Sequence, residues 1–156
     1  MKKVFAVILT VALLMSLSVT AFAANTTGGD ADITTSIDPT YTVTIPADVN
    51  VQFNATETDF GAIEVAASQI HPDKCIKVAL TTDNELNNAI DNTKVIPYAI
   101  KDADGADFTS ATYLTEGDKT ELSIHITAND WNAAYAGEYS DTVTFTVSYV
   151  DKAANN

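Results

Sequence analysis

The chain has 156 residues and a formal net charge of −13 at pH 7, because 21 acidic residues stand against eight lysines and no arginine. Nucleic acids and anionic membrane surfaces are bound through lysine and arginine, so this balance excludes both classes of partner. The length is typical of one domain that buries its own hydrophobic core.

The first 23 residues have the pattern of a secretory signal peptide. Lys2 and Lys3 precede an apolar run at residues 4–17, and residues 21–23 form an A-x-A cleavage site. We expect a chain that starts near Ala24, is secreted or held at the cell surface, and has no membrane span after cleavage. An uncleaved anchor is the alternative. Loss of the two lysines leaves a net charge of 6 − 21 = −15.

Residues 24–38 are predicted to be a leader that contains one strand-like stretch. Ala31, Ile33 and Ile37 share one parity, and Pro39 ends the pattern because proline has no N–H to donate to a sheet. An open sheet edge is a template for such a strand. Residues 31–37 therefore complete a sheet through Ile33 and Ile37, either in this molecule or in a neighbouring one.

Residues 39–151 are predicted to form an all-β domain, followed by a polar tail at residues 152–156. Apolar residues alternate with polar ones in several short segments. Gly61 predicts a bend, Pro97 predicts an edge strand, and residues 83–92 and 128–136 are expected to be connections. Between seven and nine strands at this spacing are typical of an antiparallel sandwich or barrel. The expected strands are residues 41–45, 49–53, 60–65, 75–82, 94–101, 111–115, 122–126 and 142–150.

The final strand has the clearest pattern. Val143, Phe145, Val147 and Tyr149 share one face, and threonine or serine residues occupy the other. We expect these four side chains to be buried in the main core.

The stretch GEYSDTVTFTVSY at residues 137–149 resembles the terminal strand of the spore coat protein U family and of chaperone–usher pilins. Phe60-Gly61 and Ile96-Pro97-Tyr98 resemble earlier elements of the same families. The resemblance implies an immunoglobulin-like β-sandwich and a role in surface filaments or adhesion. In pilins the N-terminal extension donates a strand to a neighbour, which is a role that residues 31–37 would fill. Those families commonly carry a cysteine pair, whereas Cys75 is the only cysteine here.

Three groups of residues are candidate sites. Asp102, Asp104 and Asp107 surround Gly105 and would offer oxygen ligands to calcium, although a solvated Asp-Gly turn is the simpler interpretation. Trp131, Tyr135 and Tyr139 would form an aromatic platform for carbohydrate or protein, or would plug one end of the sandwich. Cys75 is either an intermolecular thiol or an inert, partly buried one.

No catalytic pattern is present in the sequence. His71 and His125 are far apart, and no serine lies in a Gly-x-Ser-x-Gly elbow. We therefore expect a non-enzymatic structural or adhesive surface protein without a required cofactor, whose partner is protein, including further copies of itself. The alternatives are a carbohydrate-binding module and a calcium-dependent cell-surface domain.

Overall fold

The computed structural model describes residue 30 and residues 32–153. The chain divides into two units, residues 1–35 and 36–156, and every strand described lies in the second. The described part contains ten strands and one short helix. These are β1 (Thr40–Thr44), β2 (Glu57–Gln69), β3 (Lys74–Thr81), β4 (Glu85–Asn88), β5 (Val95–Pro97), β6 (Ala99–Asp102), β7 (Ser110–Tyr113), β8 (Lys119–His125), α1 (Ala128–Ala133), β9 (Tyr139–Ser140) and β10 (Thr144–Asp151).

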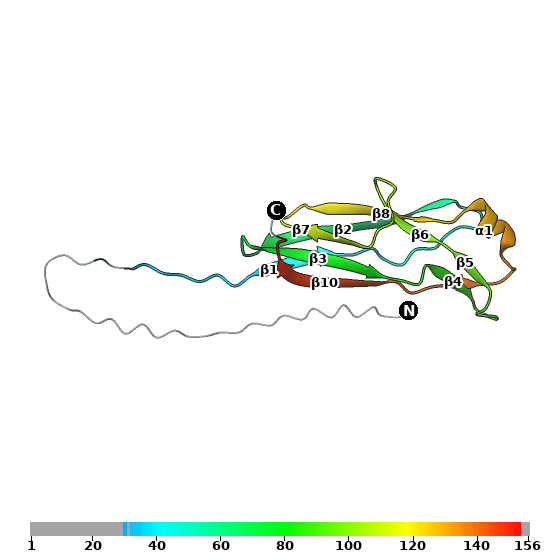
Figure 1. Ribbon diagram of the computed structural model, residues 1–156, viewed down its shortest axis with the longest axis horizontal. Coiled ribbons are helices and arrows are strands. Elements are labelled where there is room, and N and C mark those ends of the chain that lie inside the picture. Colours follow the sequence, from blue (N-terminus) through cyan, green and yellow to red (C-terminus); the bar gives the residue numbers. More distant parts are fainter. Residues whose placement is uncertain (1–29, 31, 154–156) are drawn as a thin grey trace, which may run out of the picture. The chain divides into compact units, whose positions relative to one another are not determined.

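The strands form three antiparallel sheets, which confirms the predicted all-β sandwich (Figure 1). One sheet has the order β1-β2-β8-β6 and a second has the order β10-β3-β7. A small third sheet, β5-β4-β9, lies near α1 at one end of this unit (Figure 1). β1 and β10 are both edge strands, because each pairs with a single neighbour.

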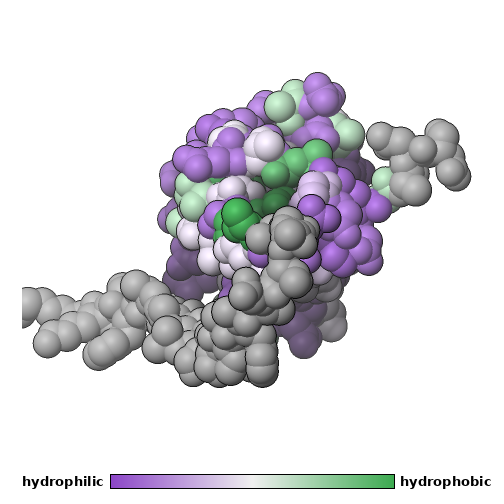
Figure 2. All heavy atoms as spheres, turned by 90° about the vertical axis from the view of Figure 1, so that its left-hand side faces the viewer, coloured by the Kyte–Doolittle hydropathy of each residue, from purple (hydrophilic) through white to green (hydrophobic). Residues whose placement is uncertain are grey.

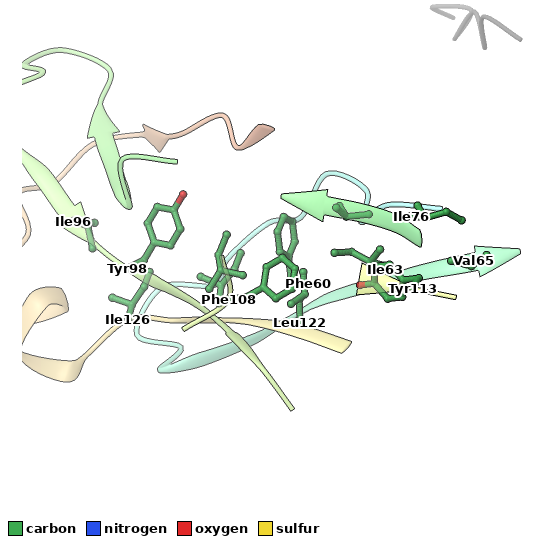
Figure 3. Close-up of a cluster of buried hydrophobic side chains, with 13 residues drawn as sticks. Phe60, Ile63, Val65, Ile76, Ile96, Tyr98, Phe108, Tyr113, Leu122 and Ile126 are labelled. Atoms are coloured by element: carbon green, nitrogen blue, oxygen red, sulfur yellow. The ribbon is translucent and has the colours of Figure 1, made fainter. Parts of the chain in front are cut away.

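The core lies between the four-stranded sheet and the sheet that contains β3. Ile63 and Val65 from β2 and Ile76 and Val78 from β3 are completely buried, as the alternation of these strands predicts (Figure 3). The rings of Phe60 and Phe145 lie 6.0 Å apart and connect β2 with β10. From the end opposite α1, the surface is mostly hydrophilic around a small apolar group, in keeping with the acidic composition (Figure 2).

Two backbone predictions are confirmed. Gly61 has a φ of +95°, and the register between β2 and β8 shifts there, as expected of a bend that needs glycine. Pro97 ends β5, which is an edge strand of the small sheet. The chain changes sheet after Pro97, so the single strand predicted at residues 94–101 is two strands, β5 and β6.

Two element predictions are wrong, and a third omits a short helix. Apolar and polar residues alternate at positions 49–53, but this segment forms no strand. Proline has no N–H to donate, so Pro46 prevents the ladder between β1 and β2 from continuing into it. Residues 83–92, which were predicted to be a loop, contain β4. This strand pairs with β5, which follows it after a turn, and with β9, which is distant in sequence. The predicted connection at residues 128–136 contains α1, which begins after Thr127, whose hydroxyl accepts the Asp130 N–H.

The final strand also differs from its prediction. The pairing is interrupted at residues 141–143, so β9 and β10 are separate strands in different sheets. Val143 and Phe145 are half-buried and pack on the core, but Val147 is 38% exposed. Tyr149 is half-buried, and its ring lies 5.8 Å from that of Tyr41. The expectation of four fully buried side chains was wrong because β10 is an edge strand that the opposing sheet covers only in part.

The predicted signal peptide and residues 24–29 lie outside the described residues. Residues 32–39 belong to no strand, and β1, the first strand of the sandwich, begins at Thr40. Within this chain, residues 32–37 therefore do not complete a sheet, and their pairing with a neighbouring molecule stays a prediction.

Candidate functional site

One concave feature of the described residues is a groove with a volume of about 930 Å³, lined by apolar residues together with polar and acidic ones. One wall is the strand-free segment at residues 45–53, and the other is the interrupted segment at residues 137–145. We call this feature the edge groove. Its floor reaches the core of the sandwich, because buried residues of the four-stranded sheet and of the β5–β6 region line it, namely Phe60, Ile96, Tyr98, Ile100 and Ile124.

The groove is open because two edge strands stop being paired at the same place. β1 ends at Thr44, before Pro46, and β10 begins only at Thr144. Among the described residues, neither edge has a further strand beside it. The walls carry apolar side chains that are exposed or half-exposed, including Ile45, Val49 and Phe53. Apolar surface and unpaired strand edges together are the features that accept an added strand.

A buried hydrogen-bond cluster lies at the floor of the edge groove. The Tyr98 hydroxyl donates to Asp141 Oδ2, and the Thr82 hydroxyl lies 2.8 Å from the Tyr98 oxygen and 3.2 Å from the same carboxylate oxygen. Burial, and then the bond to Asp141, raise the pKa of Tyr98 above its ordinary value. The phenol therefore remains a proton donor, and it ties the interrupted segment to the core.

Trp131 closes the end of the edge groove near α1. Its indole N–H donates to the Ala55 carbonyl oxygen at 2.8 Å, and the ring of Phe53 packs edge-on against it at 5.6 Å. The half-buried indole is therefore held by the protein itself. This arrangement resembles the predicted plug at one end of the sandwich.

Tyr135 and Tyr139 lie together, but not as one flat platform. The Tyr139 hydroxyl donates to the Tyr135 carbonyl oxygen and accepts from its N–H, so the Tyr139 side chain fixes the backbone of this turn. The Tyr135 ring is 63% exposed, with Lys94 Nζ 5.0 Å from its centre. Tyr135 is thus the one ring of the three predicted aromatic residues that is mainly accessible.

Two of the three predicted calcium ligands, Asp102 and Asp107, have other partners for their carboxylates. Asp102 Oδ1 accepts the N–H groups of Asp104 and Ala106, which forms the turn that Gly105 completes with a φ of +80°. Asp107 pairs with Lys101 at 2.8 Å. In residues 30 and 32–153, no group of three or more His, Cys, Asp or Glu side chains could hold a metal ion.

Cys75 is 4% exposed, and its Sγ lies 3.9 Å from the carbonyl oxygen of Asp151. Burial shields this thiol from a second chain, so an intermolecular disulfide would need β3 and β10 to separate.

One serine–histidine pair was not recognised in the sequence. Ser123 Oγ lies 2.9 Å from His125 Nε2, on the strand β8. Glu57 Oε1 lies 4.0 Å from that same nitrogen. A catalytic relay needs the acid on the opposite ring nitrogen, so this pair lacks the required arrangement.

Sequence reasoning missed the edge groove and the cluster of Tyr98, Thr82 and Asp141. The useful signal was proline directly after the alternating run at residues 41–45, which marks where an edge strand stops. No comparable signal joined Asp141 to Tyr98, because 43 residues separate them.

No protein-family model matches the chain, and no curated protein matches it. No helix in the described residues is both long enough and apolar enough to cross a membrane.

Proposed function

We propose that this chain is a secreted, non-enzymatic surface protein, structural or adhesive, that self-associates by strand addition. Residues 31–37 of one copy would occupy the edge groove of a second copy. The observation that carries the proposal is the coexistence of an open apolar groove and an unpaired segment with exposed isoleucines in the same chain.

The leader segment has the chemistry that the groove requires. Ile33 is 99% exposed and Ile37 is 62% exposed, and residues 32–39 form no strand. In an extended strand, Ile33 and Ile37 would point to one face, toward the apolar floor. Burial of each isoleucine would contribute about 1.5–3 kcal/mol, in addition to new backbone hydrogen bonds.

The leader strand contains fewer residues than either groove wall. An extended segment of seven residues is about 23 Å long at 3.3 Å per residue. The walls at residues 45–53 and 137–145 span nine residues each.

Light scattering across a range of protein concentrations tests the proposal. The exported chain should form oligomers that disappear when residues 24–38 are removed. The double variant Ile33→Asp/Ile37→Asp should also be monomeric. The matched control, Thr34→Asp/Ser36→Asp, adds the same charge on the opposite parity and should retain more association than the isoleucine variant.

A complementation experiment separates strand addition from other contacts. The chain without residues 24–38 should bind a synthetic peptide of residues 30–38, and Val143→Asp in the groove wall should abolish this binding. Monomers at all concentrations, together with no peptide binding, would rule out the proposed assembly.

Carbohydrate binding is the second candidate, and the exposed ring of Tyr135 is the observation that favours it. If this is the function, Tyr135→Ala should lose retention on a polysaccharide matrix, whereas removal of residues 24–38 should not.

A further inference from the structure

The charged residues that line the edge groove are all acidic. Asp48 lies in one wall, and Glu138 and Asp141 lie in the other, with no lysine, arginine or histidine among the lining residues. Asp48 and Glu138 are exposed. Asp141 is half-buried and receives the hydrogen bonds of Tyr98 and Thr82.

The leader that would enter the groove is acidic too. Residues 24–38 contain Asp30, Asp32 and Asp38 and no basic side chain. All three aspartates are exposed in this structure. In the added strand, Asp30, Asp32 and Asp38 lie on the parity opposite to Ile33 and Ile37, so their carboxylates would lie on the outer side of the strand, above the acidic residues of the groove walls.

We propose that this local repulsion between leader and groove controls self-association, so that the protein remains monomeric at low ionic strength and assembles when salt screens the charges. This inference rests on the proposed function, because it concerns the same groove and the same leader. The apolar contacts of Ile33 and Ile37 favour assembly at every salt concentration, whereas the like charges that the leader and the groove walls bring near one another oppose it.

Salt changes the balance between apolar attraction and charge repulsion, because dissolved ions screen the charges. The distance over which exposed charges interact is about 30 Å at 0.01 M salt, about 10 Å at 0.1 M and about 3 Å at 1 M. The first distance exceeds the size of the groove, and the last is smaller than a typical spacing between side chains on opposite strands. Assembly therefore responds to salt over this range.

Sedimentation velocity of the exported chain at these three sodium chloride concentrations tests the inference. Two variants reduce the local repulsion, Asp48→Asn/Glu138→Gln in the groove and Asp32→Asn/Asp38→Asn in the leader. The control, Asp104→Asn/Glu116→Gln, removes two exposed charges away from both. It therefore accounts for the general repulsion between molecules of net charge −15 (6 − 21).

We expect the groove and leader variants to associate at least about tenfold more tightly than the parent at 0.01 M salt and to lose most of the salt dependence. The control should resemble the parent. If the groove and leader variants associated no more tightly than the control, local repulsion would be ruled out as the cause. Assembly that depends on residues 24–38 but not on salt would overturn this inference and leave the proposed function intact. Monomers at every salt concentration would overturn both.

Discussion

Gly137 is a position where the backbone and a neighbouring side chain both require glycine. Its φ is +150°, and a Cβ atom there would lie 2.5 Å from the Asn88 side-chain nitrogen. Asn88 is buried, and its Oδ1 accepts the N–H groups of Ile90 and Asp91. Any displacement of Asn88 would break the turn that follows β4.

Gly137→Ala should therefore lower the free energy of unfolding by about 2–4 kcal/mol, from backbone strain plus the lost turn. Gly105→Ala is the matched control. Gly105 also has a positive φ, +80°, but no atom lies within 4 Å of its added Cβ, so only the strain of about 1 kcal/mol remains. Urea denaturation measures the unfolding free energy of both variants. Equal losses would show that the Asn88 side chain moves aside without cost.

Tyr98 connects the groove floor with the interrupted segment through Asp141. Tyr98→Phe removes the hydrogen bond that the phenol donates to a carboxylate, and this should cost about 1.5–3 kcal/mol. Tyr135→Phe, at an exposed ring, should change stability by less than about 0.5 kcal/mol. Thermal or urea unfolding at neutral pH measures the difference.

The raised pKa of Tyr98 also predicts a dependence on alkaline pH. An unfolded tyrosine loses its proton near pH 10, whereas folded Tyr98 keeps its proton to higher pH. Above about pH 10, the unfolded state binds fewer protons, so stability is complete below this pH and falls as the pH rises further. Urea midpoints from pH 8 to pH 11 should fall less steeply in Tyr98→Phe, and an unchanged slope would contradict this assignment.

At the scale of elements, β10 is a strand with one shared edge and one free edge. It pairs with β3 along its whole length, from Thr144 opposite Thr81 to Asp151 opposite Lys74. Phe145, next to its first residue, lines the edge groove, and its ring reaches Phe60 of the other sheet. The strand therefore stabilises the sandwich and contributes Phe145 to the proposed binding surface.

Phe145→Ala should lower the free energy of unfolding by about 2–4 kcal/mol, somewhat less than for a fully buried phenylalanine, because the side chain is half-buried. The neighbouring change Thr144→Ala removes an exposed side chain and should cost less than about 0.5 kcal/mol. If denaturant unfolding showed that both variants lose the same unfolding free energy, Phe145 would not be on the inward face of β10.

At the scale of the whole molecule, all ten described strands pair with one another within residues 40–151, and the described leader residues, 30 and 32–38, belong to no strand. Removal of residues 24–38 should therefore leave the urea midpoint of the dilute monomer unchanged. A loss greater than about 1 kcal/mol would indicate that the leader completes a sheet of its own molecule, as an internal strand does.

The sequence by itself determined the fold class, because the alternation of apolar and polar residues directly reflects which face of a strand is buried. Residues such as Ile63, Val65, Ile76 and Val78 are buried as their parity predicts, and Gly61 and Pro97 have the backbone roles that their chemistry requires. Strand parity and backbone preference depend on a residue and its immediate neighbours, so they can be predicted from the sequence.

Tertiary structure alone decided where the sheets remain open. Residues 49–53 have a strand-like pattern but no partner, whereas β4 lacks a clear pattern and is held by β5 and β9. Whether Val147 is covered, or Asp141 meets Tyr98, depends on which edges the chain brings together over long separations. A strand exists only when a second edge supplies hydrogen bonds, and the edge groove arises where that second edge is missing.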